Sequence, residues 1–177
     1  MMVPLWENIF RSDRRAKTLE AALRGNLLFR DLTAREIRLV QQIVNVRTYA
    51  PGEPVFQQGE IGVGMYIIVQ GSVDVTTEEH ARANQAPQNQ FITRLSNGDF
   101  FGEIALVEEA GRRTATVTAR EESVLIGFFK PDLMEIVNRN PGAGVKILLG
   151  LSKVLGTRLA ETTAMIRSLK LNDRIEA

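Results

Sequence analysis

The sequence has no cysteine and a single histidine, His80, among its 177 residues. Without cysteine the chain can form no disulfide, no thiolate metal site and no cysteine nucleophile. One histidine cannot supply a cluster of imidazole ligands within one chain, and no nucleophile pairs with a histidine base. These absences argue against an enzyme, so we expect no catalytic residue, no metal site and no cofactor.

The sequence also has little net charge and no long apolar run. The net charge is +1 at pH 7, which gives no general attraction to nucleic acid. No apolar stretch approaches the length of a membrane span, and the N-terminus lacks the apolar core and cleavage site of a signal peptide. We therefore expect a cytoplasmic protein.

Helical patterns occupy the N-terminal part of the chain. The segment MMVPLWENIFRS pairs Leu5 with Ile9 and Trp6 with Phe10 at a helical spacing of four residues. These aromatic residues could dock on the chain's own domain, which we favour, or touch a membrane or a partner. A second helix is expected to begin at Thr33, because Glu36 three residues later would complete a capping box.

From Val46 to Lys130 the pattern changes to short β-rich runs separated by glycine, proline and charged turns. We expect strands over 65–69, 73–76, 91–95, 114–119 and 123–130, and an exposed polar loop over 78–90. Many short strands at intervals of roughly 8–12 residues are typical of a sandwich or a jelly-roll barrel. The predicted fold is therefore mainly β, a jelly-roll (double-stranded β-helix) barrel with flanking helices.

After Lys130 the helical period returns, with a short helix that begins at Pro131 and ends near Asn140, and a long helix whose first turn holds Pro141. An apolar stripe on the long helix can pack on the chain's own barrel or pair with a second subunit. Its members are Leu148, Leu151, Leu155, Leu159, Ile166 and Leu169. We divide the chain into an N-terminal extension (1–27), a barrel domain (28–140) and a C-terminal helix (141–177).

The segment FGEIALVEEAGRRTATV, residues 101–117, carries the candidate chemistry. EIALVEE is long enough for about two helical turns, whose first N–H groups would form an anion site. Arg113 offers a two-pronged donor for phosphate, and Thr114 adds a hydroxyl. Glu103 beside a phosphate makes sense if it accepts a hydrogen bond from a sugar hydroxyl. Without a ligand, Glu103 would be a helix-capping acid and Arg113, with Arg112, part of a solvated turn.

This segment resembles the phosphate-binding cassette of the cyclic nucleotide-binding domain, a module shared by catabolite activators, kinase regulatory subunits and nucleotide-gated channels. YAPGEPVFQQGEIGVGMYIIVQGSVDV (49–75) and NGDFFGEIAL (97–106) resemble it too. The resemblance implies that the backbone of Gly102, Ile104 and Ala105 binds the cyclic phosphate. It implies that Glu103 binds the ribose 2′-hydroxyl.

The same resemblance implies that Arg113 binds the phosphate and that Thr114 touches both phosphate and base. RLAETT (158–163) resembles the catabolite-activator helix, which implies that Thr162 and Thr163 contact the base. Many relatives have proline where this sequence has Arg112. The chain stops soon after the long helix, so we expect no helix-turn-helix and no DNA-binding domain.

The sequence thus predicts a non-catalytic sensor that binds a cyclic nucleotide, cAMP in preference to cGMP. We expect it to relay binding through its C-terminal helix to an unidentified partner protein and to form a homodimer through that helix. The alternative is a degenerate jelly-roll scaffold that binds proteins and no nucleotide. The presence of Glu103 and Arg113 argues against that alternative.

Overall fold

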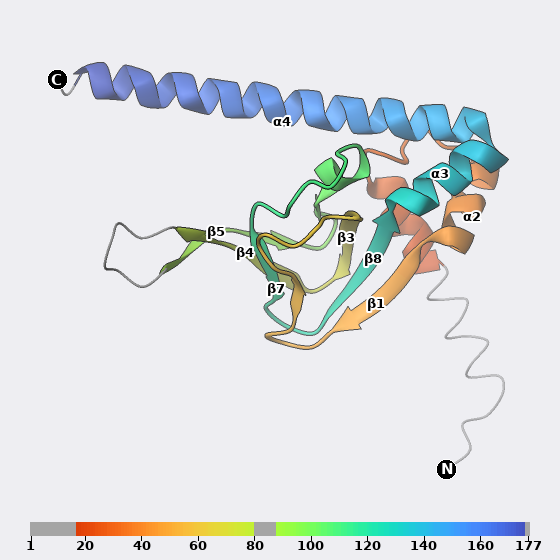
Figure 1. Cartoon of the computed structure of the whole chain (residues 1–177). Helices are drawn as coiled ribbons and strands as arrows, with labels where there is room; N and C mark the ends of the chain where they lie inside the picture. The colour runs from red at the N-terminus through yellow and green to blue at the C-terminus, as the bar shows by residue number, and fades with distance from the viewer. Residues whose placement is uncertain (1–16, 80–87, 176–177) are drawn as a thin grey trace, which may run out of the picture.

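The computed structural model describes the backbone of residues 17–79 and 88–175 and the side chains of residues 17–78 and 90–168. Two antiparallel four-stranded sheets form the barrel, in the orders β1-β8-β3-β6 and β2-β7-β4-β5. The first contains β1 (Asn45–Tyr49), β8 (Ser123–Phe129), β3 (Gly64–Gln70) and β6 (Phe100–Phe101), and the second β2 (Pro54–Phe56), β7 (Thr116–Ala119), β4 (Ser72–Glu79) and β5 (Gln88–Ser96). This arrangement confirms the predicted mainly-β fold with helices at both ends (Figure 1).

The N-terminal helices pack on one end of this barrel. Residues 17–25 are helical, and α2 (Ala34–Ile43) begins after the predicted capping box. The backbone N–H of Thr33 donates to the Glu36 carboxylate at 2.7 Å, and the Glu36 N–H donates to the Thr33 hydroxyl at 3.3 Å. The aromatic pairs of the first twelve residues, with their predicted docking or membrane contact, lie outside the described residues.

Two hydrophobic clusters stabilise the fold. The larger joins the helices to the first sheet, and in it Phe29 and Phe128 meet edge to face with ring centroids 5.3 Å apart. The smaller lies between the sheets and contains Ile68, Val117 and Leu125, all almost completely buried. The larger cluster takes Leu23 from the N-terminal extension, while the predicted boundaries of the three domains remain predictions.

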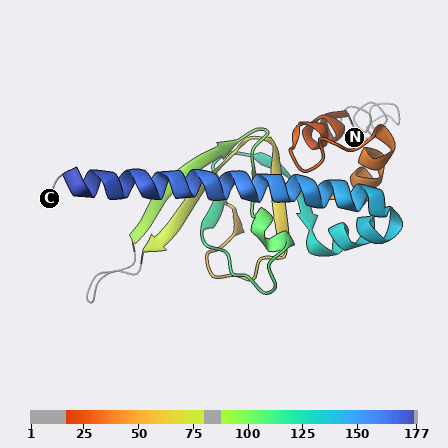
Figure 2. The same ribbon diagram turned by 90° about the horizontal axis from the view of Figure 1, so that it is seen from above.

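Two helices follow β8, as the prolines predict. α3 (Lys130–Arg139) is followed directly by α4 (Pro141–Ile175), which lies along the barrel and extends past it (Figures 1 and 2). The first half of α4 is anchored by four side chains that are at most 3% exposed, namely Ala143, Ile147, Leu151 and Val154. None of the helices in the described part of the chain is long and apolar enough to span a membrane.

The predicted stripe on α4 does not form one continuous seam. Leu151 is buried and Leu155 is partly buried against the chain's own core, whereas Leu159 is 70% exposed and Ile166 49%. The stripe divides because the core that the helices share with the first sheet reaches only the first half of α4. The side chain of Leu169 lies outside those that are described.

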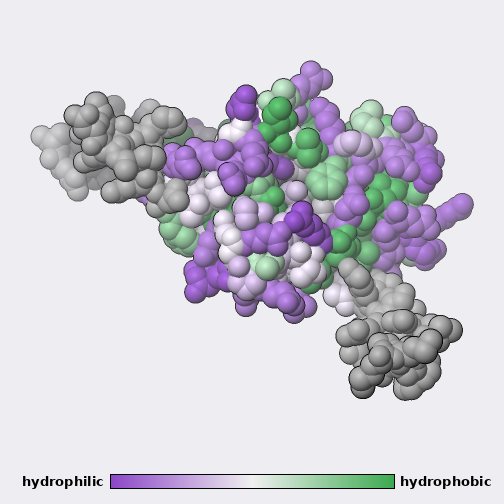
Figure 3. Space-filling model, turned by 60° about the horizontal axis from the view of Figure 1, so that its bottom comes forward, coloured by the Kyte–Doolittle hydropathy of each residue, from purple (hydrophilic) through white to green (hydrophobic). Residues whose placement is uncertain are grey.

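One loop prediction was partly wrong. The polar segment 78–90 was expected to be an exposed loop, but β4 continues to Glu79 and β5 begins at Gln88. The two strands pair from Ser72–Ser96 to Glu79–Gln88, so backbone hydrogen bonds extend the hairpin to a region where the described side chains, Glu78 and Gln90, are exposed. Polar, exposed strands carry no hydrophobic alternation that a sequence pattern could show. The surface seen in Figure 3 is mostly hydrophilic, with small separate hydrophobic patches.

Candidate functional site

The site begins at a glycine turn after β6. Gly102 has a left-handed backbone with φ of 79°, a conformation that side chains other than glycine disfavour. A Cβ on this residue would also lie 2.5 Å from Arg113 Nη1 and 3.2 Å from the carbonyl oxygen of Gly64. Gly102 is therefore required both by backbone conformation and by the close approach of Arg113.

The helix after this turn is shorter than predicted. Two turns were expected over EIALVEE, but the structure has a single 3₁₀ turn, η1 (Glu103–Leu106). The N–H of Ala105 already donates to the Gly102 carbonyl at 3.2 Å. Glutamates and Gly111 follow at once, and Ala110 has a left-handed φ of 56°, so the chain turns away before a longer helix can form. Such a short turn has a much smaller dipole than the predicted helix. Arg113 therefore has to supply most of the positive charge of the candidate anion site.

Arg113 is the charged side chain at the centre of the site. It is only 9% exposed, and its guanidinium donates to the Gly64 carbonyl at 2.8 Å and to the Gly102 carbonyl at 3.3 Å. It also lies 4.0 Å from the centroid of the Phe56 ring. Burial lowers the pKa of Arg113, against the smaller raising influence of Tyr66 and two nearby carboxylates. The cation nevertheless forms no ion pair with any carboxylate in the described part of the chain.

The neighbouring arginine is arranged differently. Arg112 is exposed, and its Nη1 donates to the carbonyl of Gly59 at 2.6 Å, on the outside of the turn. The backbone of Arg113 is held by the same turn, since the Gly59 N–H donates to its carbonyl and its own N–H donates to the Glu60 carbonyl, both at 2.8 Å. This register directs Arg113 inward and Arg112 outward.

Glu103 is completely buried and lies in η1 beside the same turn. One carboxylate oxygen, Oε1, accepts a hydrogen bond from Arg158 Nη1 at 2.5 Å. The other, Oε2, is buried and has no hydrogen-bond partner among the described residues. A buried carboxylate oxygen without a donor is costly, so this atom is well suited to accept a hydrogen bond from a ligand hydroxyl.

Arg158, on α4, is a site residue that the sequence reasoning missed. Besides Glu103, its guanidinium donates to the Phe100 carbonyl at 3.2 Å and lies 5.1 Å from the centroid of the Phe100 ring. The available signal was its position at the start of RLAETT, one helical turn before Thr162, on the face already assigned to ligand. Only the tertiary fold brings it to Glu103.

The threonines of the predicted site lie outside this buried cluster. Thr114 is exposed. Thr162 and Thr163 are exposed on α4, and their hydroxyls donate to the carbonyls of Arg158 and Leu159, both at 2.8 Å. In the single chain both hydroxyls therefore already have a hydrogen-bond partner on α4. Contact of these threonines with a base stays a prediction.

Aromatic rings surround Arg113 on its barrel side. Tyr66 stacks on Phe101 with ring centroids 5.6 Å apart, and Phe56 lies 6.0 Å from Tyr66 and 5.7 Å from Phe101. Nearby, burial raises the pKa of Tyr49 to about 12, so this phenol stays neutral at physiological pH. The arrangement combines a buried cation, a buried acceptor and apolar rings, which suits a small anion attached to a hydroxyl-bearing group.

Comparison with known proteins agrees with this geometry. Residues 46–140, more than half of the chain, match the family model of the cyclic nucleotide-binding domain. The chain is 30% identical over 139 residues to the cyclic AMP receptor protein of Thermus thermophilus, and 31% identical over 151 residues to a cAMP-dependent protein kinase regulatory subunit of Mycosarcoma maydis. These alignments cover 78% and 85% of the chain but only 60% and 26% of the two relatives.

Solved structures show the same fold. The catabolite activator protein of Thermus thermophilus matches with a TM-score of 0.70 and 27% identity, over 82% of this chain and 63% of that one. A cyclic nucleotide-binding domain from Methylobacillus flagellatus also reaches a TM-score of 0.70, at 20% identity, over 88% of this chain and 84% of that one. These matches include both the barrel and flanking helices.

Proposed function

This chain belongs to the cyclic nucleotide-binding domain family, and from that membership we propose that it is a non-catalytic sensor of cAMP. The observation that carries the proposal is Arg113, a buried cation with carbonyl acceptors and no carboxylate partner among the described residues. A buried charge without a counter-ion is unfavourable, and a bound phosphate would neutralise it with two parallel hydrogen bonds.

The remaining site residues receive complementary roles in this proposal. The backbone of Gly102, Ile104 and Ala105 contacts the cyclic phosphate, and the phosphate competes with the Gly102 carbonyl for the Ala105 N–H. Oε2 of Glu103 accepts from the ribose 2′-hydroxyl while Oε1 keeps its bond to Arg158. Thr114 contacts the phosphate and the base from the rim of the site.

We propose that cAMP is preferred over cGMP. The support comes from Thr162 and Thr163, whose hydroxyls can contact the amino group of adenine, and from two relatives named for cyclic AMP. Each threonine oxygen would accept a hydrogen bond from the base while its hydroxyl keeps the bond that it donates to an α4 carbonyl.

The proposed relay runs through α4. Arg158 joins this helix to Glu103, so ligand at Glu103 changes the environment of the contact that holds the distal helix to the barrel. Exposed Leu159, Met165 and Ile166 provide a surface for a second copy of the chain. Homodimerisation, the downstream partner and a cytoplasmic location stay predictions.

Calorimetry with cAMP and cGMP tests the proposal on wild-type protein, Arg113→Ala and the control Arg112→Ala. Loss of Arg113 should cost about 2–5 kcal/mol of binding free energy, or roughly 30-fold to several thousand-fold in affinity. Arg112→Ala should bind almost like wild type, because that side chain faces outward. No binding of either nucleotide to folded wild-type protein would favour the scaffold alternative. Equal losses in both variants would refute the assignment of the phosphate anchor.

A further inference from the structure

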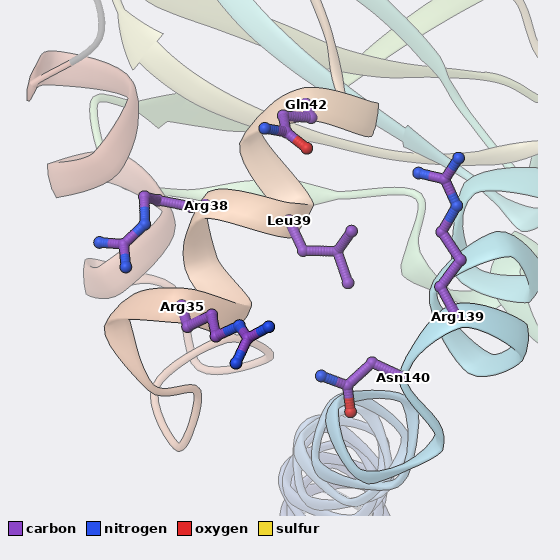
Figure 4. A pocket seen from close by; sticks show the side chains of 6 residues that line it. All are labelled: Arg35, Arg38, Leu39, Gln42, Arg139 and Asn140. Atoms are coloured by element: carbon purple, nitrogen blue, oxygen red, sulfur yellow. The ribbon is translucent and has the colours of Figure 1, made fainter.

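A basic hollow lies away from the nucleotide site, between α2 and the junction of α3 with α4 (Figure 4). Its volume is about 370 Å³, and none of its lining residues is acidic. The lining residues are Arg35, Arg38, Leu39, Gln42, Arg139 and Asn140. Figure 4 shows Leu39 between α2 and Arg139, with Arg35 and Asn140 below it, whereas Arg38 points away from Leu39 on the other side of α2.

The two arginines on α2 oppose the stability of their own helix. Arg35 lies in the first turn, where the positive end of the helix dipole disfavours a cation. Arg38, three residues later, adds a like charge on the neighbouring position of the same surface. Neither forms an ion pair with any residue that the structure describes. Both side chains are exposed, so their guanidinium groups are available to a partner.

The nearby carboxylates are already engaged. Glu36 accepts two hydrogen bonds from Lys146 on α4, at 3.0 and 2.8 Å, and Glu135 pairs with Arg139 at 3.2 Å on α3. The hollow also adjoins the first turn of α4, where Asn140 Oδ1 accepts from the Ala143 N–H at 3.1 Å. The Asn140 amide group retains its two donors. The surface therefore offers guanidinium and amide donors around one leucine.

We propose that this hollow docks an acidic peptide segment of a partner protein, in which carboxylates flank an apolar side chain. Arginine forks match carboxylates, and Leu39 supplies an apolar floor. Nucleic acid is the less suitable occupant, because Arg139 is already paired with Glu135, an apolar side chain lies between Arg139 and Arg35, and the chain carries a net charge of only +1. This inference is independent of nucleotide binding and is tested without nucleotide.

Fluorescence anisotropy with a short labelled peptide of alternating glutamate and leucine tests the proposal. The double variant Arg35→Glu/Arg38→Glu should bind about tenfold or more weakly than wild type, because it reverses two charges at the hollow. These changes place acids near the N-terminus of α2, where the dipole favours them, so the variant should stay folded. The control Arg112→Glu/Arg167→Glu makes the same change in net charge at two exposed arginines elsewhere on the surface and should bind like wild type.

Two further probes complete the test. A matched peptide with glutamine in place of glutamate should not bind, and added salt should weaken binding of the acidic peptide. The proposal is overturned if the acidic peptide shows no saturable binding, or if the control variant loses as much affinity as the test variant. It is also overturned if duplex DNA binds more tightly than the peptide and depends on Arg35 and Arg38.

Discussion

The contact between Arg158 and Glu103 should stabilise the docked position of α4. Glu103 has a side chain that is 1% exposed, whereas the side chain of Arg158 is 47% exposed, so only one member of this ion pair is desolvated. Breaking a fully buried pair costs about 3–5 kcal/mol, and an exposed pair contributes about 1 kcal/mol or less. For this half-exposed pair we expect Arg158→Ala to lower the free energy of unfolding by about 1–3 kcal/mol.

Thermal unfolding monitored by circular dichroism gives the magnitude. In a chain of this size each kcal/mol corresponds to a shift of about 2–4 °C, so Tm should fall by roughly 2–12 °C. The control is Arg167→Ala, an exposed arginine farther along α4, which should leave Tm almost unchanged. The variant should also increase hydrogen exchange in the distal half of α4, because Arg158 holds that half to the barrel.

A double-mutant cycle with Glu103→Gln isolates the interaction. Once the carboxylate is replaced by a neutral amide, Arg158→Ala should cost much less than it does in the wild-type background. We expect a coupling free energy of about 1 kcal/mol or more. Additive losses would show that the two side chains do not stabilise one another, and the proposed route from Glu103 to α4 would then be refuted.

Three further predictions follow from the site, the helix and one surface ion pair. Glu103→Gln should lower the free energy of cAMP binding by about 1–2 kcal/mol. On the wild-type protein 2′-deoxy-cAMP should bind more weakly than cAMP by a similar amount, and on the variant the two ligands should differ little. Additive losses in calorimetry would contradict the role of Glu103 at the 2′-hydroxyl. Leu159→Glu should dissociate the proposed dimer in sedimentation experiments, and it is a better test than Leu155→Glu because Leu155 packs against the chain's own core. The hydrogen bond from Lys146 is the main cause that lowers the pKa of Glu36, so the native state binds fewer protons at this carboxylate than the unfolded chain does. The resulting stabilisation is present above pH 4.5 and is lost as the pH falls. Glu36→Gln should therefore flatten this part of the curve of Tm against pH.

Local signals were sufficient for most of the fold. Thr33 and Glu36 marked a helix start because a capping box is formed within four residues, and Pro131 and Pro141 marked the next two helix starts because proline suits a first turn. The polar ends of β4 and β5 were missed because backbone pairing, and two hydrogen bonds between the Gln58 side chain and the Glu78 backbone, hold them without hydrophobic alternation. The length of η1 was missed because the turn at Ala110 opposes the helical preference of EIALVEE.

The site was predictable only where its residues are close in sequence. Gly102, Glu103 and Arg113 lie within a dozen residues, and the structure brings the Arg113 guanidinium to the Gly102 carbonyl. Arg158 is 55 residues from Glu103 in the sequence, so their contact depends on how α4 docks on the barrel. No helical or strand periodicity encodes such a distant pair, and only the tertiary structure could identify it.

The position of Arg158 along α4 explains how one small ligand could act on a long helix. Upstream, side chains as far as Val154 are buried in the core that the helices share with the first sheet, so this half cannot move without disrupting that core. Downstream, Leu159 and the residues after it are exposed, so little burial holds this half in place. Arg158 lies at the boundary and contacts the carboxylate that we propose reads the ribose. A ligand can shift the populations of the docked and undocked states of α4 only by the difference between its binding free energies for the two states. The whole ion pair contributes about 1–3 kcal/mol, so a ligand that acts through this contact can change the docked population by at most about five- to 150-fold.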